Sequence, residues 1–305
     1  MGRSRKKGRD ITGIVVLDKP KGYGSNQALQ EVRRLFDARK AGHTGNLDPM
    51  ATGVLPICLG EATKVSAFLL DADKGYRGTI RLGSRTDTGD AEGQVVETAP
   101  VPTLDRAMVE AVLERFTGTI EQIPPMYSAV KQGGQPLYKL AREGEEVERK
   151  PRSITIHGLT LLELEEGAVV LDVQCSKGTY VRTLAEEIAA ELGTVGHLEA
   201  LQRTRAGPFR LDQAVTLESL RETAEQGLEA LDARLLPAET GLEDWPEVRL
   251  SATSARYIRQ GQAVMVPNAP VDGWVRLFEG EQAFLGIGCV LYDGRVAPKR
   301  LLNAA

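Results

Sequence analysis

Strand-like and helix-like patterns alternate along this chain without the regular spacing of repeated strand–helix–strand units. Ile11 to Leu17 reads as a short buried strand, and Ser25 is expected to cap the helix that follows it. Ile154 to Leu164 and Ala168 to Cys175 alternate as two paired strands, and a strong helix begins near Val181. The pattern predicts an α+β fold, in which a mixed, largely antiparallel central sheet is flanked by helices.

At 305 residues, with 42% hydrophobic and 26% charged residues, the chain is long enough for one large folded domain and a small one. We expect a basic, flexible tail over residues 1–10 and a main domain over 11–240. Residues 245–305 are expected to form a small all-β, barrel-like domain. Its strand candidates are Val248 to Leu250, Ala263 to Val266, Trp274 to Phe278 and Ala283 to Tyr292.

Several protein classes find no support in the sequence. No apolar run approaches the ~18 residues that span a bilayer, and the basic amino end is not followed by the apolar core of a secretory signal. We therefore expect a cytoplasmic protein without membrane contact, and a monomer. The three cysteines and three histidines are scattered, and no dinucleotide-binding glycine pattern occurs, so neither a metal nor a cofactor is expected.

The charge is distributed unevenly. The whole chain has a formal net charge of -4, yet residues 1–64 hold 12 Lys or Arg against 6 Asp or Glu, a local excess of +6. The remainder carries 26 basic and 36 acidic residues, a net of -10. This asymmetry indicates a basic face near the amino end, and such a face can bind nucleic-acid phosphates whatever the total charge.

The stretch Gly42 to Gly53 is too irregular for a helix or a strand. Its glycines suit tight turns or close approach to a ligand, and Pro49 moves Asp48 towards an extended or turn conformation. An Asp-Pro step alone is an ordinary turn device. Its neighbours, among them His43, weaken the interpretation as an ordinary turn, but the loop alone does not displace it.

Several further motifs occur in a fixed order along the chain. They are Asp18-Lys19-Pro20-Lys21-Gly22, Lys74-Gly75-Tyr76-Arg77, Arg85-Thr86-Asp87-Thr88-Gly89-Asp90, Pro125-Met126-Tyr127-Ser128-Ala129-Val130-Lys131, Cys175-Ser176-Lys177-Gly178-Thr179-Tyr180-Val181-Arg182 and Gly294-Arg295-Val296-Ala297-Pro298. Together with the loop from Gly42 to Gly53, they resemble the bacterial TruB-type tRNA pseudouridine synthases nearly end to end. One departure is Asn46, where relatives more often carry Ala or Ser. The carboxy-terminal part resembles the PUA domain, a small RNA-binding fold.

The resemblance implies an isomerase that converts uridine 55 in the T-arm of tRNA to pseudouridine. In this reaction the glycosidic bond breaks, the uracil turns, and the base is rejoined through C5. The reaction as implied needs no cofactor, metal or energy source.

The resemblance also assigns the catalytic residues. Asp48 is the implied catalytic carboxylate, acting as a nucleophile, as a stabiliser of positive charge on the ribose, or as a base that removes a ribose proton. Each role requires the ionised form. Arg182 is the implied neighbour of this carboxylate, and an opposite charge within ~4–6 Å lowers an aspartate pKa by roughly 1–3 units.

The remaining implied site residues bind the substrate. Tyr76 is expected to stack on the target base, where its hydroxyl could help to move the C5 proton, and Tyr180 and Leu201 to line the uracil pocket. His43 is expected to enter the space that the flipped bases vacate.

The target base must leave a folded T-loop, which costs a few kcal/mol, whereas stacking on an aromatic ring returns about 1–3 kcal/mol. Phosphate contacts from Lys19, Lys21 and Lys64 are expected to supply most of the remainder.

Two other functions stay open at this stage. The protein could act as a tRNA-folding chaperone or RNA-binding module whose catalysis is secondary. It could also be a hydrolase that excises uracil, although no water-activating partner for Asp48 can be assigned.

Overall fold

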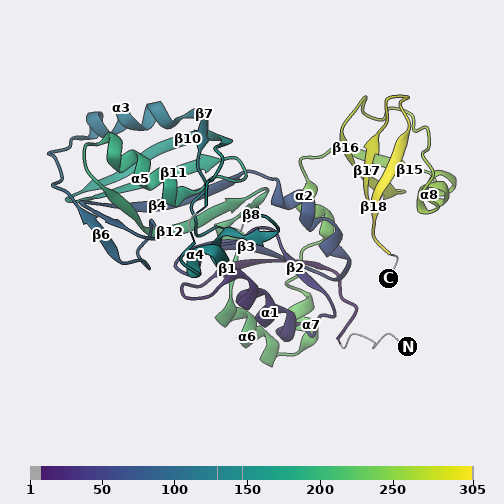
Figure 1. Ribbon diagram of the computed structural model, residues 1–305. Coiled ribbons are helices and arrows are strands. Elements are labelled where there is room, and N and C mark those ends of the chain that lie inside the picture. The colour runs from purple at the N-terminus through teal and green to yellow at the C-terminus, as the bar shows by residue number, and fades with distance from the viewer. Residues whose placement is uncertain (1–7, 129, 146, 304–305) are drawn as a thin grey trace. The chain divides into compact units, whose positions relative to one another are not determined.

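The computed structural model describes residues 8–128, 130–145 and 147–303, and its ribbon is drawn in Figure 1. The chain divides into two compact units. The first combines residues 1–48, 54–71 and 206–305, and the second combines residues 49–53 and 72–205. One of the passages from one unit to the other therefore falls between Asp48 and Pro49, inside the glycine-rich loop. The large sheet has ten strands and is mixed, which confirms the predicted fold class.

The first unit places three helices together against one side of its strands (Figure 1). Its strands pair parallel between β1 and β14 and antiparallel between β2 and β3. A buried core joins Leu17, Val32, Ile57 and Leu220 from these elements. The elements are β1 (Gly13–Lys19), α1 (Ser25–Leu35), β2 (Ala41–His43), β3 (Thr52–Leu59), α2 (Ser66–Leu70), β13 (Phe209–Arg210), β14 (Val215–Thr216), α6 (Leu217–Glu225) and α7 (Leu228–Asp232), with 3-10 turns at Gly60–Lys64, Leu211–Gln213 and Ala238–Leu242.

One local prediction for this unit is wrong. The helix α1 begins at Ser25 itself, after Gly24 as the N-cap residue, and the Ser25 side chain bonds to a distant loop instead of capping the helix. Residues 1–7 of the predicted flexible tail lie outside the described residues. Arg9 within that tail is held in place, because it forms a bridge with Ala38 and an ion pair with Asp232.

The carboxy-terminal part of the first unit is a four-stranded sheet. Its order is β15 (Glu247–Leu250), β16 (Trp274–Glu279), β17 (Ala283–Val290) and β18 (Val296–Leu301). The expected all-β composition missed the helix α8 (Ala252–Arg259), which Ser251 caps by accepting a hydrogen bond from the Ser254 N–H. The expected strand at Ala263 to Val266 is reduced to a single bridge between Val264 and Val296.

The second unit is built on a sheet with the order β12, β4, β11, β10 and β7. From β4 to β7 every neighbouring pair is antiparallel, and β11 follows β4 without interruption from Ala168 opposite Arg81 to Cys175 opposite Lys74. The helices α3 and α5 pack on this sheet, in a core that includes Val109, Leu184 and Ile188 (Figure 1). The elements are β4 (Lys74–Leu82), β5 (Ser84–Thr86), β6 (Val95–Thr98), α3 (Arg106–Phe116), β7 (Gly118–Gln122), β8 (Lys131–Gln132), β9 (Gln135–Pro136), α4 (Leu137–Arg142), β10 (Arg152–Glu165), β11 (Ala168–Cys175), α5 (Val181–Glu191) and β12 (Gly196–Ala206).

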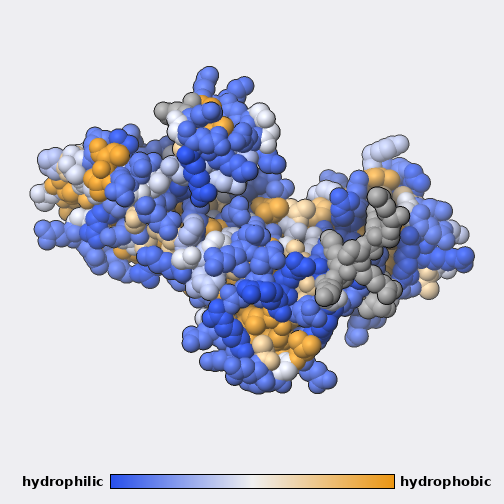
Figure 2. Space-filling view, turned by 60° about the horizontal axis from the view of Figure 1, so that its bottom comes forward, coloured by the Kyte–Doolittle hydropathy of each residue, from blue (hydrophilic) through white to orange (hydrophobic). Residues whose placement is uncertain are grey.

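Hydrophilic residues cover most of the face shown in Figure 2, and hydrophobic residues form separate patches on it. Over the described ranges 8–128, 130–145 and 147–303, no helix is long and apolar enough to cross a membrane.

Candidate active site

The loop that carries Asp48 leaves strand β2 after His43 and returns through β3. His43 pairs with Ile57 across these two strands, and the Thr44 N–H donates to the Pro56 carbonyl at 3.2 Å. The Gly45 N–H donates to Nδ1 of His43 at 3.4 Å, so the imidazole is held at the start of the loop. Asp48 itself is half-buried.

Farther along the loop, backbone contacts bind Leu47 and Gly53. The Leu47 N–H donates to the Ser25 hydroxyl at 2.7 Å, and that hydroxyl donates to the Leu47 carbonyl at 3.0 Å. Gly53 pairs with Arg203 of β12 in the second unit and has a φ of 99°. A Cβ atom on Gly53 would lie 2.2 Å from the Arg203 carbonyl oxygen, so only glycine fits there.

Tyr76 lies on β4 of the second unit, opposite Val173 of β11. It is half-buried and packs against the core of this unit. Gly78 follows on the same face of the strand, since side chains two residues apart share a face. A Cβ atom on Gly78 would meet Leu201 at 3.8 Å and Leu198 at 3.4 Å, so Leu201, also half-buried, lies over the backbone near Tyr76.

Tyr180 immediately precedes α5, and Gln122 at the end of β7 holds its backbone on both sides. The Tyr180 N–H donates to the Gln122 side-chain oxygen at 2.8 Å, and the Gln122 amide donates to the Tyr180 carbonyl at 3.2 Å. Gln122 is buried. The role of Gln122 could not be predicted from the sequence, because a single Gln at a strand end has no distinctive pattern.

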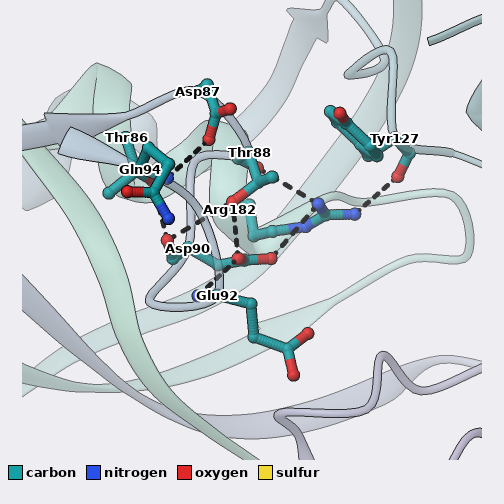
Figure 3. A network of polar contacts seen from close by, with 8 residues as sticks. All are labelled: Thr86, Asp87, Thr88, Asp90, Glu92, Gln94, Tyr127 and Arg182. Carbon is teal, nitrogen blue, oxygen red and sulfur yellow. Dashed lines mark hydrogen bonds and ion pairs between the residues drawn. The ribbon is translucent and has the colours of Figure 1, made fainter. Parts of the chain in front are cut away.

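Arg182 is buried in the first turn of α5 and forms the centre of a polar network (Figure 3). Its guanidinium lies 3.3 Å from the Asp90 carboxylate and donates to the carbonyls of Thr88 at 3.1 Å and Tyr127 at 2.7 Å. Asp90 in turn accepts hydrogen bonds from the Thr88 hydroxyl at 2.7 Å and from the Glu92 N–H at 3.1 Å. The role of Asp90 was not predicted, although the run Arg85 to Asp90 was recognised as a motif.

A second carboxylate lies next to this network on α5. Burial raises the pKa of Glu186 above its usual range, while the nearby Arg85 and Arg182 act in the opposite direction. A Cβ atom on Gly89 would lie 3.3 Å from the Glu186 carboxyl group, so the loop leading to Asp90 packs closely on Glu186. The guanidinium of Arg182 is thus held by the buried Asp90 carboxylate and two backbone carbonyls.

The structure shows the surroundings of two lysines that were expected to contact phosphates. Lys19 is fully buried, with 0% exposure, and its ammonium donates to the carbonyls of Pro20 at 2.9 Å and Tyr23 at 2.6 Å. Lys19 therefore stabilises the turn after β1 and does not contact phosphate as expected, because a buried ammonium cannot meet a phosphate at the surface. Lys64 is partly exposed, donates to the Leu301 carbonyl at 2.7 Å and pairs with Glu61.

Among the residues that the structure describes, no three His, Cys, Asp or Glu side chains are grouped so that they could hold a metal ion. Asp48 offers acid–base or nucleophilic chemistry at a carboxylate, and Tyr76 and Tyr180 offer aromatic rings for stacking. Asp48 and His43 belong to the first compact unit, and Tyr76, Tyr180, Arg182 and Leu201 belong to the second.

Comparison with known proteins defines the class of enzyme. Residues 33–181 match the family description "TruB family pseudouridylate synthase (N terminal domain)". Residues 182–243 match the "tRNA pseudouridylate synthase B C-terminal domain", and residues 246–302 match "Pseudouridine synthase II TruB, C-terminal". The chain is thus a pseudouridine synthase, an isomerase.

Full-length relatives identify the family. The chain is 56% identical over 305 residues, with 100% of both chains covered, to tRNA pseudouridine synthase B of Pseudomonas putida. It is 55% identical to the protein of the same name from Nitrosococcus oceani, over 98% of this chain and 97% of the other. The chain belongs to the TruB family.

Two solved structures share the fold. A chain of a Cbf5-Nop10-Gar1 complex superimposes with a TM-score of 0.74 and 25% identity, over 96% of this chain and 84% of that chain. A chain of an H/ACA RNP bound to a substrate RNA containing 2'-deoxyuridine gives a TM-score of 0.76 at 22% identity, over 99% of this chain and 92% of that one.

Proposed function

We propose that the protein converts uridine 55 in the T-arm of tRNA to pseudouridine, and that Asp48 is its catalytic carboxylate. The observation that carries the proposal is the loop that holds Asp48 between two bound backbone segments, in a chain of the TruB family. Relatives that match end to end are named for tRNA. A tRNA substrate agrees with the basic excess in residues 1–64.

In the proposed reaction the C1'–N1 bond of the nucleotide breaks and a C1'–C5 bond forms. The proton at C5 leaves, N1 gains one, and the RNA keeps its mass. Asp48 acts in its ionised form, as a nucleophile at C1', as a stabiliser of ribose charge, or as a base towards a ribose proton. All three roles need a carboxylate at a fixed distance from the sugar, which a bound loop provides.

The base is flipped out of the T-loop to reach the carboxylate, at a cost of a few kcal/mol. Tyr76 stacks on it, and Tyr180 and Leu201 line the uracil pocket. His43, held by its bond with the Gly45 N–H, fills the space that the base leaves. Stacking offsets about 1–3 kcal/mol, so phosphate contacts at the basic surface, with Lys21 and Lys64 among them, supply the rest.

Arg182 is the proposed counter-charge of Asp48. Its guanidinium has five N–H donors, and the Asp90 carboxylate and two carbonyls hold it in one orientation. A fixed cation keeps a neighbouring carboxylate ionised without having to reorganise during the reaction.

The carboxy-terminal sheet with α8 is proposed to be a PUA-like module that binds tRNA away from the reacting base. The other parts of the proposal are that the enzyme works in the cytoplasm, as a monomer, and without a metal or cofactor.

Release of tritium from [5-³H]uridine in an unmodified tRNA transcript tests the proposal. Asp48→Asn keeps the shape of the side chain but removes its charge, so we expect release to fall by at least about a thousandfold. Asp212→Asn, which changes an exposed aspartate in the 3-10 turn Leu211–Gln213, is the matched control and should match the unaltered enzyme. Full release by Asp48→Asn would refute the catalytic assignment.

The alternatives give different outcomes. A uracil-excising hydrolase would lower the mass of the RNA, whereas isomerisation leaves it unchanged. If Asp48→Asn is inactive yet accelerates tRNA folding as the unaltered protein does, a chaperone function exists beside catalysis. Replacement of Tyr76 and His43 together without loss of folding yield would count against that function.

A further inference from the structure

Ser25, the first residue of α1, contacts the loop of Asp48 from 22 residues away in the sequence. Its Oγ accepts a hydrogen bond from the Leu47 N–H at 2.7 Å and donates one to the Leu47 carbonyl at 3.0 Å. A single hydroxyl therefore satisfies both backbone groups of the residue that immediately precedes Asp48.

Both partners of this contact are buried, with exposures of 5% for Ser25 and 6% for Leu47. Backbone N–H and C=O groups that are shielded from water need a partner within the protein. The Ser25 side chain makes no capping bond to its own helix, which has Gly24 as its N-cap residue. Its hydroxyl is thus available to the loop.

The support behind Ser25 is rigid. Helix α1 is fixed in the core of the first unit through Ala28, Leu29 and Val32. On the other side of Asp48, the ring of Pro49 restricts the backbone φ angle. Asp48 consequently lies between a residue bound to a packed helix and a residue with a restricted backbone.

We propose that Ser25 is a positioning residue that sets the direction of the Asp48 carboxylate through the backbone of Leu47. This inference rests on the proposed catalytic role of Asp48. Ser25 touches the loop and not the reacting atoms, so its loss should slow the chemical step while the affinity for tRNA is retained.

The test is Ser25→Ala, measured by single-turnover tritium release with enzyme in excess. A displacement of the order of 1 Å lowers a rate by about a hundredfold, so we expect the rate constant to fall about 10- to 100-fold. The Kd for tRNA should change less than about threefold, because ground-state contacts persist. Thr216→Ala is the matched control: it removes the hydroxyl that caps α6 by accepting the Ser219 N–H at 3.1 Å, and it should keep the normal rate.

Amide hydrogen exchange provides a measurement that is independent of catalysis. In Ser25→Ala the Leu47 amide should lose protection while those of Ala28 and Leu29 in α1 keep theirs. Ser25→Thr retains a hydroxyl and should restore most of the rate. If Ser25→Ala does not fold, Ser25→Cys replaces it, since a thiol fits the space but bonds weakly.

A Leu47 amide that stays protected in Ser25→Ala, a normal rate for that variant, or a Ser25→Thr variant as slow as Ser25→Ala would overturn the inference. Asp48→Asn is measured in parallel. If Asp48→Asn is active, the proposed catalytic role of Asp48 fails. If Asp48→Asn is inactive and Ser25→Ala is normal, only the positioning role fails.

Discussion

Removal of the Asp90 carboxylate should destabilise the protein far more than removal of a surface carboxylate. The side chains of Arg182 and Asp90 are 7% and 5% exposed, so Asp90→Ala removes a carboxylate that pairs with this guanidinium in the interior. Loss of one partner of a buried pair costs about 3–5 kcal/mol. Arg182 still donates to the carbonyls of Thr88 and Tyr127, which places the loss at the lower end.

The hydrogen bonds that Asp90 accepts add to this loss. The Thr88 hydroxyl and the Glu92 N–H lose their acceptor in Asp90→Ala, but both groups are near enough to water to recover part of the energy. We therefore expect Asp90→Ala to lower the free energy of unfolding by about 3–4 kcal/mol. Asp90→Asn keeps an acceptor oxygen, so its loss should be smaller, about 2–3 kcal/mol.

Urea-induced unfolding, followed by circular dichroism, measures these differences, and Glu163→Ala is the matched control. Glu163 pairs with Arg77 at the surface, where the two side chains are 51% and 49% exposed, and its loss should cost about 0–1 kcal/mol. The double variant Asp90→Leu/Arg182→Met removes both charges and should be less destabilised than the sum of its single variants. Equal losses of unfolding free energy for Asp90→Ala and Glu163→Ala would refute the view that the Asp90–Arg182 pair is shielded from water.

Two further predictions concern the backbone near Asp48 and a buried acid. Gly53→Ala should lower the free energy of unfolding, measured in urea, by more than about 3 kcal/mol, because its Cβ would lie 2.2 Å from the Arg203 carbonyl oxygen. At Gly193 the backbone φ angle is also positive but the space is open, so Gly193→Ala should lower this free energy by only about 1 kcal/mol. Similar losses would contradict the steric argument. The pKa of Glu186 is raised by burial, so its protonated form is favoured by folding, and its stabilising contribution is lost as the pH rises from the ordinary value of 4.5 through the folded-state value. Glu186→Gln should gain stability relative to the unaltered protein across that window, and a constant difference between pH 4 and 8 would exclude this role.

The hydrophobic periods of the sequence predicted most elements near their observed positions. The pair Ile154 to Leu164 and Ala168 to Cys175 corresponds to β10 and β11, because alternation with a turn between two strands is a local signal. The strong helix expected near Val181 corresponds to α5, which begins at that residue. Helix α8 was missed because it is only eight residues long and lies among strand signals.

Candidate site residues could be predicted where they lie in a recognisable motif, as Asp48 and Tyr76 do. The burial of Lys19 could not be predicted, because its acceptors are the carbonyl groups of Pro20 and Tyr23. A carbonyl group is present at every residue and leaves no mark in the sequence. The same reason explains why the expected capping role of Ser25 was wrong: its true partner is the backbone of Leu47.

Side chain-to-backbone bonds recur at each part of the candidate site. Ser25 holds Leu47, Gln122 holds Tyr180, and Arg182 donates to Thr88 and Tyr127. Such a bond requires a particular amino acid only at the residue that supplies the side chain. The other residue contributes its backbone, so its own side chain can change without loss of the bond. The residue that supplies the side chain is therefore the informative position for mutation. An exchange of Ser25 or Gln122 should alter the geometry of the site more than an exchange of the residue to which it is bound, provided that the new residue at that position keeps the backbone conformation and the packing.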